Sequence, residues 1–173
     1  MTNVSKSLFV VFVAAIFVMG VMVIPSITSA AELKNASPAF SVTWPDEWTE
    51  KAPDEKEDLK TLDGPDKDKG FSISIYEMGD LKKLEDAAAE YGKGLVESGI
   101  GSEFEIISNE AVETQDGSPA YFAETEWMYG GSTMITTGIM SAFKDGKWIC
   151  VHLWTLGALE DEEMEILKSL KLE

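Results

Sequence analysis

The sequence predicts an α+β protein in which a central antiparallel β-sheet of about six strands is flanked by two main helices. Several segments alternate apolar and polar side chains with the period of two expected of half-buried strands, and two others repeat apolar residues at helical spacing. Gly130-Gly131 and Asp145-Gly146 separate consecutive strand-like segments as tight hairpin turns do, so the strands that they join are antiparallel. The predicted order is strands, a helix, three or four strands, and a final helix.

The N-terminus has the three parts of a secretory signal. Lys6 is the only charged side chain before the apolar run Leu8–Ile24, and a proline and several small residues follow the run. These features predict a signal peptide over residues 1–30 and export to the periplasm or the extracellular space, with cleavage after Ala30 or, almost as well, after Ala31. The run is also close to the minimum length that spans a bilayer, so an uncleaved N-terminal anchor is the alternative.

The rest of the chain has the length of one domain. Residues 31–37 are interpreted as a polar lead, and residues 38–173 as a single α+β domain that is long enough to bury a core without disulfides. No second apolar stretch long enough to cross a bilayer follows the signal, which predicts no stable membrane insertion after cleavage. Cys150 is the single cysteine and has no partner for an internal disulfide.

The charge is strongly acidic. The chain has 31 Asp and Glu against 14 basic residues, all of them lysine, and a formal net charge of −17. Because arginine supplies the rigid fork that grips phosphate groups, nucleic acid and anionic lipid are poor candidate partners for this chain. In the simplest interpretation the acidic residues keep an exported protein soluble, and in the alternative they attract cations or a basic partner. The sequence predicts no resident cofactor.

The stretch FSVTWPDEW predicts the first strand of the domain and the turn after it. Phe40, Val42 and Trp44 alternate with two hydroxyl residues along the strand. Pro45 fixes the backbone after the strand, which allows Trp48 to fold its ring back under the sheet. This structural role is the favoured interpretation, and an exposed aromatic platform for a ligand or partner is the alternative.

Residues 51–70 are dense in charge, proline and glycine. They predict an exposed connection with one short edge strand near Leu59–Leu62. Asp66 and Asp68 have the spacing of calcium ligands, but the lysines beside them oppose a cation, so a solvated hairpin loop is predicted instead. The stretch FSISIYEM then alternates as a second clear strand.

Two segments predict helices. Asp80 is a candidate N-cap for the first, which ends near Ser98-Gly99 and is weakened locally by Gly92 and Gly94. Its apolar stripe consists of Leu81, Leu84, Ala88, Tyr91 and Leu95. The second helix lies in LEDEEMEILKSLKLE, where acids in the first turn and lysines near the end match the helix dipole.

The segment between the two helices is rich in strands. The predicted strands are EFEIIS, SPAYFAETEWMY, TMITTGIMSAF and KWICVHLWTL. The last is largely apolar on both faces, which predicts a central strand covered on both sides. Its alternation places Trp148, Cys150, His152 and Trp154 on one face.

Cys150 and His152 are candidate ligands of a soft metal, because they point to the same side of their strand. A copper or zinc site needs more ligands, and the candidates are Met128, Met134 and Met140 on neighbouring strands. The alternative is that the cysteine and the histidine are ordinary core residues. The candidate ligand or partner contacts are Trp44, Trp48, Trp148 and Trp154.

The pattern resembles the PsbP-like, Mog-type fold family, which includes DcrB-like small periplasmic proteins. The resemblance covers nearly all of residues 38–173. It rests on FSVTWPDEW after the signal, on the DG turn before KWICVHLW, and on the terminal EILKSLKL. It implies a central antiparallel sheet flanked by helices, and a non-enzymatic binding, assembly or accessory role. The nuclear Ran-binding branch does not suit an exported chain.

We therefore expect an exported, non-catalytic binding or accessory module of the cell envelope. It would contact a protein partner or a small ligand through one sheet face or through the acidic stretch 51–70. No G-x-S-x-G elbow, Gly-rich phosphate loop or H-E-x-x-H motif is present in the sequence. The alternatives are a copper- or zinc-binding protein that uses Cys150 and His152, and a hydrolase that uses a pair of carboxylates.

Overall fold

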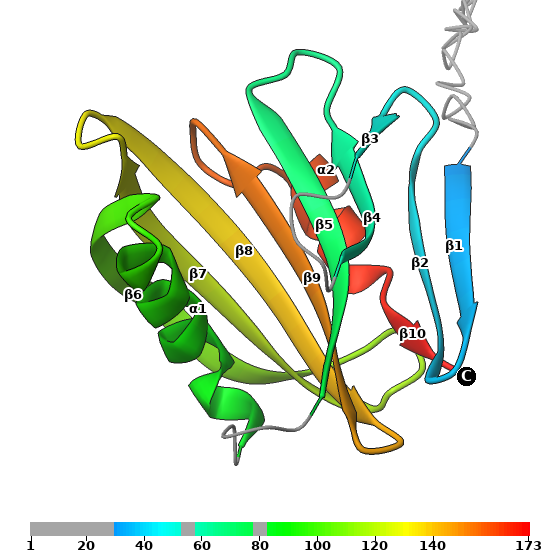
Figure 1. The fold of residues 1–173 in the computed structure, drawn as a ribbon. Coiled ribbons are helices and arrows are strands. Elements are labelled where there is room, and N and C mark those ends of the chain that lie inside the picture. Colours follow the sequence, from blue (N-terminus) through cyan, green and yellow to red (C-terminus); the bar gives the residue numbers. More distant parts are fainter. Residues whose placement is uncertain (1–29, 53–57, 78–82) are drawn as a thin grey trace, which may run out of the picture.

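The computed structural model describes residues 30–52, 58–77 and 83–173. The predicted signal, apart from Ala30, lies outside the described residues, as do the candidate cap Asp80 and Leu81 of the helical stripe. The described part is an α+β fold with ten strands in two antiparallel sheets, more than the six or so expected, and two α-helices (Figure 1). None of the described helices is long and apolar enough to cross a membrane.

The larger sheet has seven strands, and every neighbouring pair is antiparallel. In spatial order they are β3 (Thr49–Lys51), β4 (Asp58–Asp63), β5 (Lys69–Glu77), β9 (Lys147–Thr155), β8 (Thr133–Lys144), β7 (Pro119–Tyr129) and β6 (Gly101–Glu113). The stretch KWICVHLWT is therefore the middle strand of the sheet, as its two apolar faces predict. The predicted edge strand is β4, but β3 covers its outer side.

The smaller sheet has three strands in the order β1 (Ala30–Ala36), β2 (Ala39–Pro45) and β10 (Lys171–Leu172). The segment interpreted as a polar lead forms most of β1, which pairs with β2 along its whole length. Ala31 and Leu33 of β1 pack against the main core, and the exposed Glu32 and Lys34 face away. Only two small or medium apolar side chains carry this alternation, so the pattern is weak in the sequence.

Both predicted hairpin turns are confirmed. Gly130 and Gly131 join β7 to β8, and Asp145 and Gly146 join β8 to β9. All four residues have positive φ, between 51° and 78°. Asp145 and Gly146 form a two-residue turn, for which this conformation matches the twist of the sheet, whereas the loop at Gly130 and Gly131 also includes Ser132. The loop between β4 and β5 is also a hairpin, closed by a hydrogen bond from the backbone N–H of Gly64 to the carbonyl of Lys69 (2.9 Å).

The two helices cover opposite faces of the larger sheet (Figure 1). One face carries the 3₁₀ turn η1 (Leu84–Asp86) and α1 (Ala87–Glu97), and the other carries α2 (Asp161–Lys168). Within α1, Gly92 lets the helix approach β6, because an added Cβ there would lie 2.3 Å from the ring of Phe104. A Cβ added at Gly94 would have no other atom within 4 Å.

The main core lies between α2, the smaller sheet and one face of the larger sheet. Trp44 and Trp48, at the two ends of the WPDEW turn, are about 95% buried and pack at 5.6 and 5.2 Å from the ring of Phe71. The structural interpretation of this turn is confirmed, since both rings are enclosed in the core. They are not available as an exposed platform.

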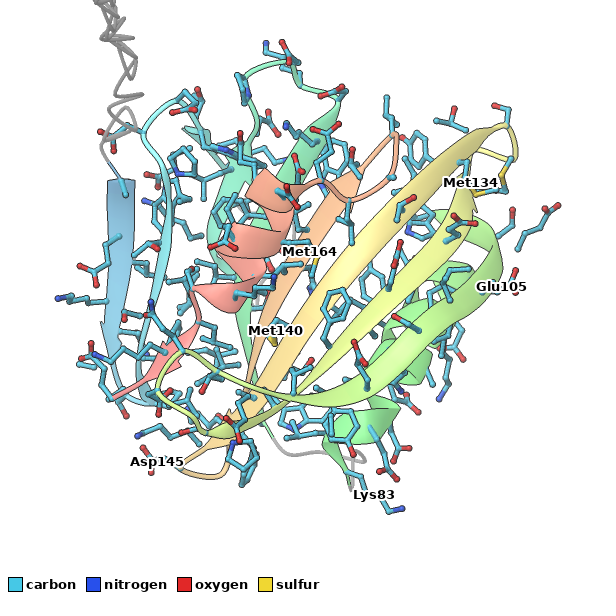
Figure 2. The ribbon with its side chains drawn as sticks, turned by 180° about the vertical axis from the view of Figure 1, so that it is seen from behind. Lys83, Glu105, Met134, Met140, Asp145 and Met164 are labelled. Atoms are coloured by element: carbon cyan, nitrogen blue, oxygen red, sulfur yellow. The ribbon has the colours of Figure 1, made fainter. Side chains whose placement is uncertain are left out.

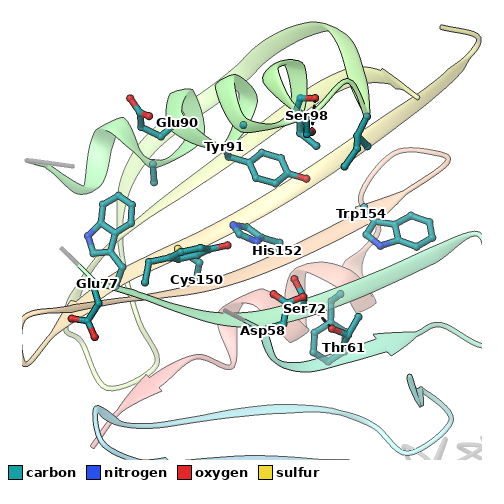
Figure 3. Close-up of a pocket in the computed structure, with 17 residues that line it drawn as sticks. Asp58, Thr61, Ser72, Glu77, Glu90, Tyr91, Ser98, Cys150, His152 and Trp154 are labelled. Carbon is teal, nitrogen blue, oxygen red and sulfur yellow. Dashed lines mark hydrogen bonds between the residues drawn. The ribbon is translucent and has the colours of Figure 1, made fainter. Parts of the chain in front are cut away.

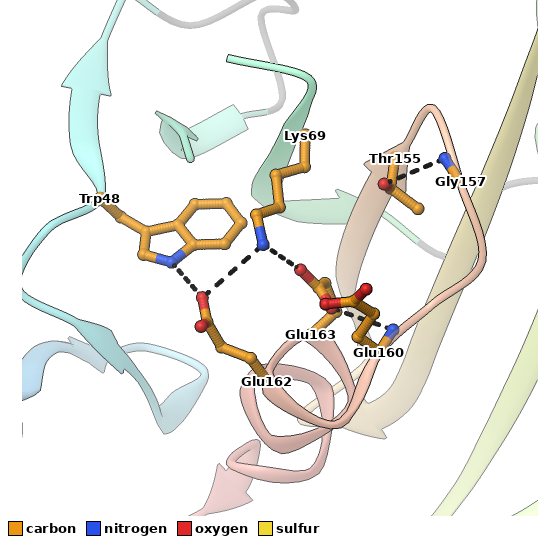
Figure 4. Close-up of polar contacts among 7 residues, drawn as sticks. All are labelled: Trp48, Lys69, Thr155, Gly157, Glu160, Glu162 and Glu163. Carbon is orange, nitrogen blue, oxygen red and sulfur yellow. Dashed lines mark hydrogen bonds and ion pairs between the residues drawn. The ribbon is translucent and has the colours of Figure 1, made fainter. Parts of the chain in front are cut away.

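A buried polar network ties α2 to β5 and to the WPDEW turn (Figure 4). The Lys69 ammonium donates to Glu163 Oε1 at 2.5 Å, and the Glu163 side chain is 2% exposed. Burial by itself would raise the pKa of Glu163, but hydrogen bonds from Lys69 and from the backbone at the start of α2 outweigh it, and the pKa is lowered. Glu162 accepts a hydrogen bond from the indole N–H of Trp48 (3.2 Å).

We predict that Lys69→Met lowers the free energy of unfolding by about 2–3 kcal/mol, because it leaves the Glu163 carboxylate buried without its cation. The matched control is Lys60→Met, which breaks an ion pair with the exposed Glu50 and should cost less than about 1 kcal/mol. Urea unfolding of both variants at pH 7 measures the difference. Equal losses for the two variants would contradict the assigned role of the network.

The two glycines of α1 give a second prediction. Gly94→Ala should raise the free energy of unfolding by about 0.5–1 kcal/mol, because alanine favours the helix and the site is open. Gly92→Ala should lower it by about 1–3 kcal/mol, because the new methyl group collides with Phe104. Thermal and urea unfolding of the two variants measure the sign of each effect, and a stabilising Gly92→Ala would contradict the close contact between α1 and Phe104.

Candidate functional site

The candidate site begins with the alternation of β9, the middle strand. Ile149, Val151 and Leu153 are fully buried on the α2 side of the sheet. The alternate residues face α1, namely Trp148, Cys150, His152 and Trp154. One strand therefore supplies a dry apolar face to the core and a mixed aromatic and polar face to the other side.

A cleft of about 550 Å³ lies between that second face and α1 (Figure 3). Its volume is in the range of small-molecule sites. In Figure 3, Glu90, Tyr91 and Ser98 lie on the helix side, and Ser72 and Thr61 lie on the opposite side. Other residues that line the cleft are Asp58, Tyr76, Glu77, Ala87, Trp148, Cys150, His152 and Trp154.

His152 stands in the middle of the cleft and is partly buried. Its ring stacks on Tyr91 with a centroid distance of 4.9 Å and an interplanar angle of 30°, and Tyr76 lies at 6.4 Å. Burial lowers the pKa of His152 to about 4, against an opposing effect of the Asp58 charge. The imidazole is therefore neutral at physiological pH and acts as a flat aromatic surface with one donor and one acceptor.

Cys150 is 2% exposed and lies beside Ser141, with Sγ and Oγ 3.5 Å apart. Burial raises the pKa of the thiol to about 11, so it is protonated at neutral pH and is a poor nucleophile. The residues that the structure describes contain no group of three or more His, Cys, Asp or Glu side chains arranged to hold a metal ion.

The methionines proposed to complete a metal site do not reach it. Met140 pairs with Val151 and Met128 pairs with Met134, and both pairs lie on the sheet face opposite Cys150. Figure 2, which views the molecule from behind, shows Met140 beside α2 and Met134 near the turn between β7 and β8. The sequence does not reveal this, because the face of each methionine depends on the pairing register of β8.

The side of the cleft formed by β4 and β5 is polar. Asp58 accepts hydrogen bonds from Ser74 (2.6 Å) and Thr61 (3.3 Å), which hold its carboxylate in place. The indole of Trp154 lies close over β5 at Gly70, where an added Cβ would be 2.8 Å from the ring. Glycine at this position therefore makes room for the Trp154 ring at one end of the cleft.

The four tryptophans proposed as contacts fall into two groups. Trp148 and Trp154 line the cleft together with Cys150 and His152, whereas Trp44 and Trp48 belong to the core on the far side of the sheet. Sequence reasoning missed the further lining residues, namely Asp58, Thr61, Ser72, Tyr76, Glu77, Glu90 and Tyr91. Alternation along FSISIYEM places Tyr76 on the face opposite Phe71, and helical spacing places Tyr91 on the apolar stripe of its helix, but neither pattern distinguishes a cleft from a core.

Two of the three carboxylates that line the cleft pair with lysines at the surface. Glu77 is 79% exposed and pairs with Lys147 at 3.0 Å, and Glu90 is 51% exposed with Lys93 at 3.7 Å. The third, Asp58, accepts hydrogen bonds from Ser74 and Thr61. The hydrolase alternative stays a prediction.

Solved structures of other proteins share this arrangement of strands and helices. The solution structure of cyanobacterial PsbP (CyanoP) from Synechocystis sp. PCC 6803 has a TM-score of 0.66 and 17% identity, over 90% of this chain and 99% of that one. The Ran-binding protein Mog1p of Saccharomyces cerevisiae has a TM-score of 0.59 and 10% identity, over 84% and 96%. The chain has the PsbP/Mog1-like fold. Comparison with protein-family models and with curated proteins gives no match.

A protein of Bacteroides thetaiotaomicron has a similar fold with a lower TM-score of 0.51 and 15% identity, over 82% of this chain and 48% of that one. At such identities the comparisons establish the fold alone. The PsbP/Mog-type part of the family resemblance is therefore confirmed at the level of fold, and the DcrB-like part stays a prediction.

The pKa of His152 leads to a prediction about stability and pH. The unfolded state binds a proton at His152 below about pH 6.5, while the folded state resists protonation until about pH 4. Stability contributed by the neutral ring is therefore complete above pH 6.5 and is lost as the pH falls to 4. Relative to His152→Gln, the wild type should lose about 2–3 kcal/mol over this window. Urea unfolding of both proteins at pH 7, 5.5 and 4 measures this loss. If the free energy of unfolding of the wild type and of His152→Gln changed equally with pH, the lowered pKa of His152 would be refuted.

Proposed function

We propose that this protein is an exported, non-catalytic binding module that holds a small ligand in the cleft between α1 and the larger sheet. The single observation that carries the proposal is the cleft itself, a volume of about 550 Å³ lined by aromatic rings with a few polar groups. Such a lining is typical of ligand sites, in which apolar surface supplies affinity and a few polar atoms fix orientation.

The chemistry of the cleft favours binding over catalysis. The one histidine is neutral and is stacked against tyrosine, and the one cysteine is a buried thiol. Acyl transfer and related reactions need an activated nucleophile beside a base, and Cys150 shares a hydrogen bond only with the hydroxyl of Ser141 among the contacts described. The residues present are suited to recognise a molecule and to leave it unchanged.

Location in the cell envelope is supported by the sequence. The charged start, apolar run and small residues of positions 1–30 are those of a secretory signal, and the acidic surface suits an exported soluble protein. One neighbour by fold, yeast Mog1p, is a Ran-binding protein, so the fold can also present a surface to a protein partner. In our proposal a protein partner of the envelope recognises this module with or without its ligand.

A fragment screen tests the proposal. In ¹H–¹⁵N correlation spectra, fragments of neutral, cationic and anionic type are added singly to the chain that starts at Ala31. We expect the fragments that bind to shift resonances of α1, β5 and β9. Trp154→Ala should weaken the affinity for these fragments by about tenfold, or about 1.4 kcal/mol. Tyr129→Ala removes an exposed aromatic ring outside the cleft and should leave the fragment affinities unchanged. Hits that avoid the cleft, or the absence of any hit, would refute the proposal.

A further inference from the structure

We infer that the cleft takes an organic cation, a small molecule with a substituted ammonium group held against aromatic rings and facing a carboxylate. This inference rests on the proposed function, since it specifies the ligand of the same cleft. It follows from two features of the lining, its rings and its charges.

The rings are the first feature. The aromatic side chains of the cleft face that line the cleft are Tyr76, Tyr91, Trp148, His152 and Trp154. The electron-rich faces of tryptophan and tyrosine attract ammonium groups within about 6 Å, and the attraction is stronger where water is excluded. His152 adds to this surface without opposing it, because the neutral ring carries no positive charge at physiological pH.

The charges are the second feature. Asp58, Glu77 and Glu90 line the cleft, and no lysine is among its lining residues in the described part of the chain. Glu77 and Glu90 pair with lysines at the surface. Asp58 accepts hydrogen bonds from Ser74 and Thr61 on the sheet side. The Asp58 charge also acts on His152 in the middle of the cleft, where it favours the protonated ring. The field inside the cleft therefore attracts positive charge.

Two other ligand classes fit this lining poorly. An anion would meet carboxylates and no cationic side chain in the described lining. A bare metal ion would find a protonated thiol and a single imidazole in a space many times its own volume.

The experiment compares a cation with its neutral isostere. Choline and 3,3-dimethylbutan-1-ol have the same shape and hydroxyl group and differ in the charge of the central atom. Calorimetric titration should show choline binding at least about tenfold more tightly, a difference of about 1.4 kcal/mol. Asp58→Asn should reduce the affinity for choline about tenfold and leave the alcohol unaffected. Asp63→Asn is the matched control, because Asp63 lies on the same strand, pairs with Lys51 and does not line the cleft.

Trp154→Leu gives a second readout that does not depend on Asp58. It keeps an apolar side chain and removes the π-face, so choline should lose more affinity than the alcohol. Equal affinity for choline and the alcohol, or preferential binding of glucose or maltose, would overturn the inference and leave the cleft as a ligand site. Failure of choline together with the absence of any fragment in the cleft would overturn the proposed function as well.

Discussion

The structure depends on the strict alternation of side chains along one strand, β9. Successive residues of a strand point to opposite faces, so β9 presents two rows of side chains to two separate environments. The first row is Ile149, Val151 and Leu153, and the second is Trp148, Cys150, His152 and Trp154. The first row closes the core against α2, and the second forms the floor of the cleft under α1. A shift of one residue in the pairing of β9 with β5 would place the histidine in the core and expose the aliphatic row, so the core fixes the register of the site.

Much of the fold is readable from the sequence, because the signals that set it are local. The turns at Gly130-Gly131 and Asp145-Gly146, the central position of β9 and the dipole-matched α2 are each encoded within a few neighbouring residues. The cleft is not encoded in this way. Asp58 on β4 and Tyr91 on α1 meet at His152 only through strand pairing and helix docking across long sequence separations. For the same reason alternation identified the shared face of Cys150 and His152 and could not place the three methionines.

The edges of the larger sheet are poorly suited to the addition of another strand. At one edge β3 is only three residues long. At the other, β6 is long but carries Glu103, Glu105, Glu110 and Glu113, and its pairing with β7 is interrupted by two irregularities. Charged side chains and bulges are the usual means of preventing another strand from pairing with an exposed edge. The acidic composition therefore has a structural use here in addition to solubility.

The cleft exists because the two helices present side chains of different size to the sheet. Ile166 and Leu167 of α2 fill the space above their face of the sheet and are fully buried. The buried residues of α1 are Ala87, Ala88 and Gly92, which reach only a short distance from the helix axis. Tyr91 of α1 packs against the ring of His152, and the volume of the cleft remains between α1 and the sheet. A close-packed interior would lose stability from such a gap, so the contrast between a fully packed α2 face and an under-filled α1 face supports the ligand site that we propose there.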